Sequence, residues 1–525
     1  MSPRDKRQAI WSYILGSESE HGSQFIVTKQ DKRIYVVLAA INEIVALPPW
    51  GKGGDKFLAY LFGMYGIDSH DPASAAVYGL ARHHALLNGL QVDLRRFTAY
   101  NTESKTVYFS GYNGRMWRID GGTPEEIVNG EEGIFFIDDD EGSHVEPDYG
   151  PHGILFDMLA NLNYDKGAGG INPDQQRRML ITWMFACAFP DMFPHKPLML
   201  VEGAYGSGKT LGVTLIQQAL TGRMRPMSVS KHQEKDFGVI LLRSPIAMLD
   251  NQDTFQEWLQ DQICTYATYG DFPKRKLYSD DEEMIIKPQS FVAITSKNPS
   301  TFRREDIVDR LLIMRLKRYE QFRNAKKIMA EIAEQRSKIF GEFMWYVNLI
   351  VEAMRNEVIP EQQEKWRMSD FATFTRYVGY VLGWTQEEID DTLDAMQAER
   401  DVFAAENDPI LEVLHRWITY RVRGQPSNIG REVELTTLFR EMKRLTDAED
   451  ITFYKHHSTL ADKLRTTYVA RHFQVEVRHD EQGGRFYRIW RHEDPQLGLV
   501  EEEEPIDLAP PAQPIPVIRM VKKGS

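Results

Sequence analysis

Within the first 320 residues of the chain, the apolar residues follow two patterns, one after the other. Residues 92–99, 106–110 and 116–119 alternate apolar and polar side chains between turn signals such as Gly-Tyr-Asn-Gly at 111–114. This alternation predicts a small antiparallel sheet that ends near Phe136. Later, continuous apolar runs are separated by segments with helical apolar spacing, which is typical of a buried parallel sheet with helices between its strands.

The C-terminal part of the chain has a third pattern, in which helices precede a hairpin. Helical segments are predicted at 409–423, 437–445 and 458–472, and strands at 474–478 and 485–490. Residues 480–484 between the strands form a hairpin turn signal. Three helices closed by a hairpin predict a winged helix, which commonly docks on duplex DNA and also serves as a protein-docking module. The expected DNA contacts are Lys463, Arg465 and Arg471 on the third helix, with Arg485 and Arg488 on the wing.

These patterns predict an α/β protein with several domains, as its length also suggests. We expect an N-terminal α+β domain at 1–155, an α/β core at 156–320, a helical lid or connector at 321–407, a winged helix at 408–493 and a disordered acidic, proline-rich tail at 494–525.

Composition and charge limit the class of protein. The chain has 525 residues, of which 42% are apolar, and a formal net charge of −13. The apolar fraction is ordinary for a globular protein, and the longest apolar stretch is too short to span a bilayer. Its two cysteines, Cys187 and Cys264, provide neither a disulfide framework nor a zinc site. We therefore expect a cytoplasmic protein without membrane contact, and the negative charge argues only weakly against nucleic-acid binding.

The apolar run 198–201 leads into the segment with the clearest chemistry. A glycine-rich loop follows it, and then a helical segment, which is the order that a phosphate-binding P-loop needs. The glycines let backbone N–H groups surround phosphate, Lys209 neutralises it, and the Thr210 hydroxyl holds Mg²⁺. The residues expected to contact a nucleoside triphosphate are Gly203, Tyr205, Gly206, Ser207, Gly208, Lys209 and Thr210.

Two further apolar strands end in polar residues that suit the same site. Asp250 follows the run 245–249 and is predicted to hold Mg²⁺ beside Thr210. The segment 245–251 resembles a Walker B motif, in which a glutamate usually follows the aspartate and polarises the attacking water. Asn251 stands in that place, so Asp253 is the nearest carboxylate that can act as base. Asn298, after the next strand, is placed to orient the water.

Arg310 lies just before another apolar strand. An arginine there either stabilises the γ-phosphate held by a neighbouring subunit or pairs with Asp306 or Asp309 of its own chain. Arg303 and Arg304 are the alternatives if Arg310 is structural.

Taken in order, these motifs resemble those of AAA+ ATPases over about residues 160–400. The segment 265–290 contains Lys274, Arg275 and Lys276 and then an acidic run at 280–283. It is similar to the hairpin that superfamily 3 and minichromosome-maintenance helicases project into a ring pore to hold DNA. In the alternative interpretation, the basic residues form ion pairs with the acidic run across the same hairpin. Arg367 resembles a nucleotide-sensing arginine of the lid.

The resemblance is closest to replicative helicases of the poxvirus-primase type in phages, plasmids and other mobile elements. It implies an ATP- and Mg²⁺-dependent DNA helicase, assembled as a homo-oligomer, most simply a hexamer, with single-stranded DNA in the pore and duplex at the winged helix. Asn251 keeps open an alternative, a DNA-binding ATPase switch such as an initiator, a helicase loader or a transposition regulator. No clustered carboxylates of a primase site are evident.

Aromatic and basic residues also gather on the predicted small sheet. They are Tyr108, Tyr112, Arg115, Trp117 and Arg118. Such a set either clamps a single nucleic-acid strand or forms the solvated face of a half-buried sheet, and the second interpretation is favoured.

Overall fold

The computed structural model describes most of the chain. The described residues are 3–16, 23–29, 32–38, 43–137, 142–254, 256–268, 272–275, 283–286, 288–297, 302, 304–321, 323–407, 409–419, 428–445, 456–465, 467–480, 483–492 and 518–522. They form two compact units, Met1–Arg400 and Asp401–Ser525. The five domains expected from the sequence, with their boundaries, stay predictions.

The first unit begins with a small α/β layer. Its sheet has the order β3-β2-β1-β4, in which β1 and β4 are parallel and the other pairs antiparallel. The strands are β1 (Gln24–Thr28), β2 (Ile34–Leu38), β3 (Glu43–Ala46) and β4 (Leu90–Val92), and the helices are α1 (Pro3–Leu15), α2 (Asp55–Tyr65) and α3 (Pro72–Asn88). Apolar residues of the helices and of one sheet face share a core around Phe57 and Tyr78.

The predicted antiparallel sheet is present as a four-stranded meander. It consists of β6 (Thr98–Asn101), β7 (Thr106–Ser110), β8 (Arg115–Ile119) and β9 (Glu125–Val128), while β5 (Leu94–Arg95) pairs with β10 (Phe135–Phe136). Phe109 of β7 lies 5.8 Å, between ring centres, from both Phe340 and Phe343 of α11 (Arg336–Arg355). One face of the meander therefore packs on a helix more than 200 residues later in the chain.

The basic residues of this meander are paired within it. Arg115 lies 2.8 Å from Glu126, and Arg118 lies 2.9 Å from Glu125 and 3.0 Å from Glu132. Tyr108 is buried and donates to Glu132. These contacts support a half-buried sheet with paired side chains, rather than a clamp for a nucleic-acid strand.

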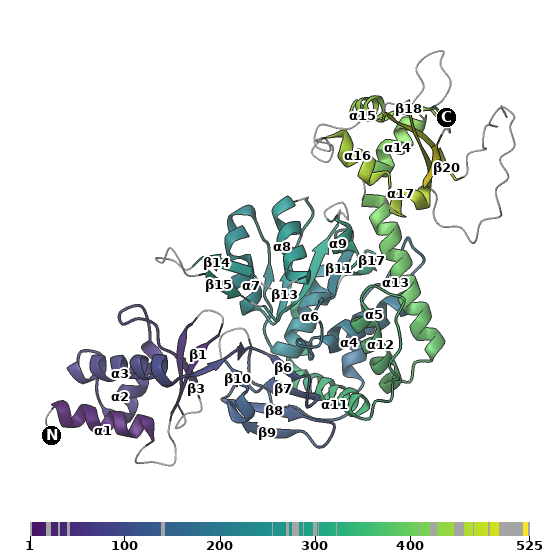
Figure 1. Ribbon diagram of the computed structural model, residues 1–525. Helices are drawn as coiled ribbons and strands as arrows, with labels where there is room; N and C mark the ends of the chain where they lie inside the picture. Colours follow the sequence, from purple (N-terminus) through teal and green to yellow (C-terminus); the bar gives the residue numbers. More distant parts are fainter. Residues whose placement is uncertain are drawn as a thin grey trace. The chain divides into compact units, whose positions relative to one another are not determined.

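A five-stranded parallel sheet forms the centre of the first unit (Figure 1), with the order β12-β13-β16-β11-β17. Its strands are β11 (Leu198–Gly203), β12 (Pro226–Met227), β13 (Ile246–Leu249), β16 (Phe291–Ser296) and β17 (Leu311–Leu316). β13 and β16 are buried along their whole length, as their continuous apolar runs predict. The next strands after β11, which are β12, β13 and β16, lie on one side of it in the strand order, whereas β17 lies on its other side. The loop after β11 therefore lies at the switch point of the strand order, where ligands of such sheets bind.

Helices flank this sheet and continue beyond it. They are α4 (Ile154–Ala160), α5 (Pro173–Ala186), α6 (Lys209–Thr221), α7 (Phe237–Arg243), α8 (Glu257–Thr268), α9 (Glu305–Val308), α10 (Ala325–Glu334), α11, α12 (Ser369–Leu382) and α13 (Gln386–Asn407). α6 contacts β11, β13 and β16, and α5 contacts β17. Asn172 is the N-cap of α5 and forms a capping box with Gln175, and a proline occupies the first turn. These two features fix where the helix starts.

A hairpin lies between α8 and β16, where the sequence predicts one. β14 (Phe272–Arg275) pairs antiparallel with β15 (Glu283–Ile286), with Lys274 opposite Met284 and Arg275 opposite Glu283. Lys276 and the rest of the connecting turn lie outside the described residues.

The second unit contains the predicted helices and hairpin, with two differences. Its elements are α14 (Pro409–Thr419), β18 (Val433–Glu434), α15 (Leu435–Lys443), α16 (His457–Lys463), α17 (Thr467–His472), β19 (Phe473–His479) and β20 (Arg485–Arg491). The single helix predicted at 458–472 is wrong, because α16 ends in a tight turn at Leu464 and Arg465. Two threonines follow this turn in the sequence, and threonine is poor inside a helix but suits a helix start.

The tail also differs from expectation. Ile518–Lys522 forms β21, which pairs parallel with β19, so the prediction of disorder over 494–525 is wrong for these residues. Ile518 lies opposite Val475 and Met520 opposite Val477, and the open edge of β19 offers the backbone groups that this strand uses. The remaining tail residues lie outside the described part of the chain.

Two features are absent from the described residues. No helix among them is long and apolar enough to cross a membrane. Within the same residues, no cluster of three or more His, Cys, Asp or Glu side chains is arranged to hold a metal ion.

Candidate functional site

The loop between β11 and α6 has a backbone that requires glycine. Gly206 and Gly208 have φ of 79° and 82°, a region that side chains disfavour. A Cβ on Gly203 would lie 2.3 Å from the carbonyl oxygen of Leu316 and 2.6 Å from Ser207 Oγ. The three glycines therefore allow the tight loop expected from the sequence.

Lys209, the first residue of α6, folds back over this loop. Its Nζ donates to the carbonyl oxygens of Gly203, at 2.6 Å, and Ala204, at 3.3 Å. Burial lowers the pKa of Lys209, while the nearby Asp253 and Asp250 oppose this effect. The ammonium group is thus held at the loop by carbonyl dipoles and by two carboxylates.

Asp250, directly after β13, is held by two hydroxyl groups. Its Oδ1 accepts from Thr210 Oγ1 at 2.8 Å and from Thr295 Oγ1 at 2.6 Å. Thr295 is buried near the end of β16, the strand beside β13. Thr295 was not among the residues predicted from the sequence, and the signal that points to it is a hydroxyl near the carboxyl end of a neighbouring parallel strand.

Asn251 adopts a left-handed backbone conformation, with φ of 55°. Its Nδ2 donates to Asp250 Oδ2 at 3.0 Å, and its backbone N–H donates to Thr295 Oγ1 at 3.0 Å. Asparagine tolerates this conformation better than most residues, because its short side chain makes local hydrogen bonds. Asn251 therefore braces Asp250.

Asp253 turns toward the end of β16. Its Oδ1 accepts from the backbone N–H of Lys297 at 2.8 Å and lies 3.4 Å from Ser296 Oγ. Lys297 Nζ is 3.7 Å from Asp253 Oδ2 and 2.8 Å from Tyr205 Oη, and these two groups raise the pKa of Lys297, Tyr205 more strongly. Tyr205 is 68% exposed. Lys297, which was not predicted from the sequence, contacts both Tyr205 of the loop and Asp253, the candidate base, and so links them.

Glu202, the residue before Gly203, belongs to a partly buried ion cluster. Arg315 of β17 lies 3.0 Å from Glu202 Oε2 and also pairs with Glu399 of α13. Glu399 is 1% exposed in its side chain and accepts from the backbone N–H of Gly169 at 2.7 Å. The strand that carries the loop is thereby fixed to its neighbour and to α13.

The arginines that were predicted near the nucleotide make different contacts in the structure. Arg310 is buried and donates to the backbone carbonyl oxygen of Asp306 in its own chain. The contact lies within one chain, as in the structural alternative, but it uses the backbone of Asp306 and not its carboxylate. Arg367 precedes α12 rather than opening it, and pairs with Asp309. Arg304 pairs with Asp306 at 2.7 Å.

Several predicted residues lie partly or wholly outside the described residues. Asn298, Lys276 and Arg303 are among those not described, and only the backbone is described for Lys274, Arg275 and Arg471. On the second unit, Lys463 lies at the end of α16, and Arg465 and Arg485 are exposed. Arg488 lies 2.9 Å from Glu432.

The side chains of the loop suit a phosphate group and a magnesium ion. Ser207 Oγ is buried and has no hydrogen-bond partner among the described residues. A carboxylate and a hydroxyl, Asp250 and Thr210, are oxygen donors of the kind that Mg²⁺ prefers, together with phosphate and water.

Residues 170–395 match the model of a family described as "Actinomycete integrative conjugative element replication protein". The match includes the parallel sheet, the loop and α12, so the central part of the chain is similar to replication proteins of mobile elements. No curated protein matches the chain.

Solved structures give distant likenesses. The A form of the apo NrS-1 C-terminal region is 12% identical, with a TM-score of 0.42, over 78% of this chain and 77% of that chain. A second apo structure of that region has a TM-score of 0.38 at 12% identity, over 75% and 94% of the two chains. A JCV helicase with a bound acetamide compound has a TM-score of 0.20 at 12% identity, over 47% and 71%.

Proposed function

We propose that the protein is an ATP-dependent DNA helicase that acts in the replication of a mobile element. The observation that carries the proposal is the cluster of Lys209, Thr210, Asp250 and Thr295 around the loop at the switch point of the sheet. The parallel sheet with this loop at its switch point agrees with the α/β core that the motifs predict, and the central match to mobile-element replication proteins supports the biological setting.

Each residue of the cluster has a proposed role in ATP hydrolysis. Loop N–H groups and Lys209 bind the phosphates, and Thr210 and Asp250 hold Mg²⁺, which would neutralise developing negative charge on the phosphates. Asp253 accepts the proton of the attacking water, since the amide of Asn251 cannot. Asn298 orients this water, and Arg367 senses the nucleotide from the lid.

Hydrolysis is coupled to DNA by two proposed contacts in a homo-oligomeric ring, most simply a hexamer. The hairpin β14–β15 carries Lys274, Arg275 and Lys276 to the backbone of a single strand in the pore. The second unit acts as a winged helix and meets duplex DNA through Lys463, Arg465, Arg471 and Arg485. Arg310 acts on the neighbouring subunit, which requires it to leave the carbonyl oxygen of Asp306.

A strand-displacement assay on a forked duplex with Mg²⁺ and ATP tests the proposal. The parent protein should separate the strands, and Lys209→Ala should not, because the charge that faces the phosphates is removed. ATP turnover by Lys209→Ala at the parent rate would refute the nucleotide site.

Asn251 favours a second candidate, a DNA-binding ATPase switch that assembles on DNA without unwinding it. Such a protein would bind ATP and DNA and hydrolyse ATP slowly, yet leave the fork intact at every protein concentration. The same assay therefore separates the two candidates, provided that DNA binding and ATP turnover are measured on the same preparation.

A further inference from the structure

Lys297, the residue that follows β16, brings a second ammonium group to the loop that precedes Lys209. Its Nζ donates to Tyr205 Oη of that loop at 2.8 Å and lies 4.7 Å from the centre of the Tyr205 ring. The same Nζ lies 3.7 Å from Asp253 Oδ2, and the side chain of Lys297 is 39% exposed. Lys297 therefore lies between the loop and the carboxylate that we propose as the base.

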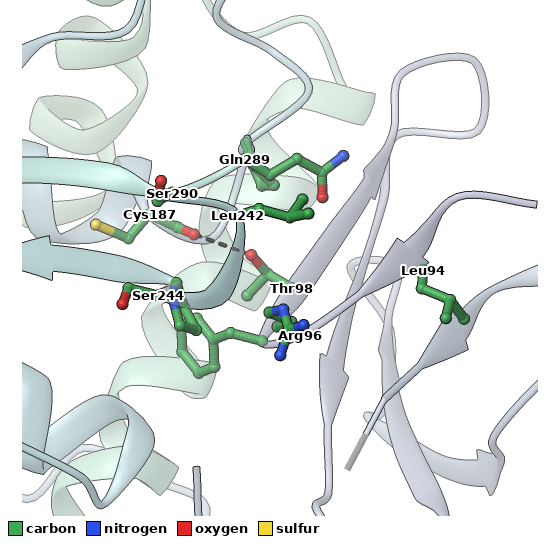
Figure 2. A pocket seen from close by; sticks show the side chains of 11 residues that line it. Leu94, Arg96, Thr98, Cys187, Leu242, Ser244, Gln289 and Ser290 are labelled. Atoms are coloured by element: carbon green, nitrogen blue, oxygen red, sulfur yellow. Dashed lines mark hydrogen bonds between the residues drawn. The ribbon is translucent and has the colours of Figure 1, made fainter. Parts of the chain in front are cut away.

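These contacts are at the carboxyl edge of the parallel sheet, where ligands of such sheets bind. A small hollow lies at the other edge, because Ser244 and Ser290 of its lining precede β13 and β16. Figure 2 shows this hollow, in which Thr98 Oγ1 donates to the carbonyl oxygen of Cys187 at 3.0 Å. The side chains that follow β13 and β16, and not those of the hollow, are therefore the ones within reach of the nucleotide.

The contacts of the Lys297 ammonium group are of kinds that exchange easily. An ammonium group has several N–H donors. Within the part of the chain that the structure describes, its short hydrogen bond goes to the neutral hydroxyl of Tyr205. The separation of 3.7 Å from Asp253 is longer than a direct N–H···O hydrogen bond, and ion pairs with this exposure are weak. A stronger acceptor beside the loop can therefore replace these contacts.

Asp253 does not depend on this ammonium group for its position. Its Oδ1 accepts from the backbone N–H of Lys297 at 2.8 Å and lies 3.4 Å from Ser296 Oγ. Neither contact involves the side chain of Lys297. A substitution of that side chain therefore removes the ammonium group and leaves the contacts that hold Asp253 in place.

Lys209 and Lys297 place two positive charges beside the same carboxylate. Burial lowers the pKa of Lys209, Asp253 and Asp250 oppose this effect, and Lys297 adds to it. A terminal phosphate group carries about −1.5 to −2 charges at pH 7. Because a cation forms a stronger hydrogen bond with an ionised phosphate oxygen than with a neutral hydroxyl, such a group is the kind of acceptor that can take Lys297 from Tyr205.

The proposed base indicates where the terminal phosphate lies. Asp253 can take a proton only from a water within hydrogen-bond distance, and that water attacks the terminal phosphate. The phosphate is then separated from Asp253 by a single water. Since Lys297 Nζ lies beside the same carboxylate, on a flexible side chain, it is within reach of the phosphate oxygens.

We propose that Lys297 contacts the terminal phosphate of a bound nucleoside triphosphate and so distinguishes a triphosphate from a diphosphate. The inference rests on the proposed nucleotide site and deepens it. Lys297 Nζ exchanges the hydroxyl of Tyr205 for a phosphate oxygen, while Lys209 and the loop N–H groups hold the phosphates that both nucleotides share. A diphosphate offers Lys297 no such oxygen.

Equilibrium binding of fluorescent ADP and of a fluorescent, slowly hydrolysed ATP analogue tests this role. The measurements use the full chain with Mg²⁺ and without DNA, and the ratio of the two affinities is compared between variants. Lys297→Met removes the ammonium group and keeps the length of the side chain, whereas Lys297→Arg keeps the charge. A thermal melt of each variant checks that it folds.

Lys365 offers a matched control, because it makes the same kinds of contact elsewhere. Its Nζ lies 2.8 Å from Asp394 and 4.8 Å from the centre of the Trp366 ring. Lys365→Met removes the same charge from a carboxylate and an aromatic ring that do not belong to the loop. It should leave the affinity ratio unchanged.

Lys297→Met should bind ADP as the parent does and the ATP analogue roughly tenfold more weakly, since one charge-assisted hydrogen bond is lost. Lys297→Arg should retain most of the parent ratio. An unchanged ratio in folded Lys297→Met would overturn the inference and leave the nucleotide site intact. Equal losses for the two nucleotides would also overturn it, because they would make Lys297 a structural support of the loop.

The same measurements separate this inference from the proposed function. Lys209→Ala should lose affinity for both nucleotides, whatever the role of Lys297. If the parent bound neither nucleotide, or if Lys209→Ala bound both as the parent does, the proposed nucleotide site would fail and the role of Lys297 with it.

Discussion

At the scale of single residues, the side chain and the backbone of Asn251 act together. Its left-handed φ of 55° places its amide against Asp250 and its backbone N–H against Thr295. A glutamate at this position would lose the local hydrogen bonds of the asparagine amide and would bring a second negative charge beside Asp250. Asparagine is therefore the more favourable residue beside Asp250 in this structure.

We predict that Asp253→Asn lowers ATP turnover more strongly than Asn251→Ala, because Asp253 is the proposed base. Asn251→Glu should not raise turnover, and it should lower the free energy of unfolding by about 1 kcal/mol, because the amide hydrogen bond to Asp250 is lost and a second negative charge replaces it. Steady-state ATPase rates and thermal melts measure both effects. Equal, small effects of Asp253→Asn and Asn251→Ala would place the base elsewhere.

Thr295 offers a second prediction at this scale. Thr295→Val keeps the shape of the side chain but removes the hydrogen bond to Asp250, so Mg²⁺-dependent nucleotide affinity should fall by roughly tenfold, about 1.4 kcal/mol. Thr182→Val is a control, since that buried hydroxyl bonds only within α5, to the carbonyl oxygen of Arg178. Equilibrium binding of a fluorescent ATP analogue, with and without Mg²⁺, gives the difference.

The sequence predicted part of this site because part of it is local. Lys209, Thr210 and the glycines occupy one loop whose spacing carries the chemistry, and Asp250 ends an apolar run. Thr295 and Lys297 reach the site only because β16 lies between β13 and β11, an order that spacing along the chain does not reveal. The inward position of Arg310 also depends on tertiary contacts.

At the scale of elements, the hairpin β14–β15 is present as the sequence predicted, whereas its contact with DNA is a proposal. Its register sets Arg275 opposite Glu283, which allows one cross-strand pair, while Lys274 lies opposite the uncharged Met284. Alternate residues of a strand point to opposite faces, so the consecutive basic residues cannot all make the same contact.

We predict that Lys274→Ala together with Lys276→Ala preserves ATP binding and assembly but removes stimulation of the ATPase by DNA and abolishes unwinding. Arg275→Ala should have a smaller effect, because its register partner is acidic. Forked-duplex unwinding and ATPase rates at saturating DNA are the measurements. Unwinding at the parent rate by the double variant would exclude the hairpin as the element that moves DNA.

At the scale of the whole molecule, two compact units are joined in one chain, and the local patterns of both were largely visible in the sequence. The alternation of β6 to β8, the hairpin β19–β20 and the apolar strands β11, β13 and β16 follow from residue periodicity. The packing of Phe109 on α11 and the pairing of β21 with β19 were not predicted, because each joins segments distant in sequence.

The proposed ring gives a prediction at this scale. Subunits with Arg310→Ala should bind ATP but hydrolyse it poorly, and mixing them with Lys209→Ala subunits should restore part of the activity at interfaces that combine an intact loop with an intact arginine. ATP turnover of the mixtures is measured with co-assembly confirmed by cross-linking. Because Arg310 is buried, a thermal melt of the variant accompanies the assay, and a lack of rescue in stable mixed rings would make Arg310 structural.

The cluster of Glu202, Arg315 and Glu399 has a consequence for how descendants of this protein can change. Arg315 is shared by both carboxylates, so its loss leaves Glu202 and the buried Glu399 without that counterpart. Removal of one partner from a buried pair costs about 3–5 kcal/mol, whereas replacement of a whole cluster by apolar residues is often nearly neutral. Substitution of Arg315 alone is therefore expected to be selected against. These three positions should be inherited, or exchanged, as a set.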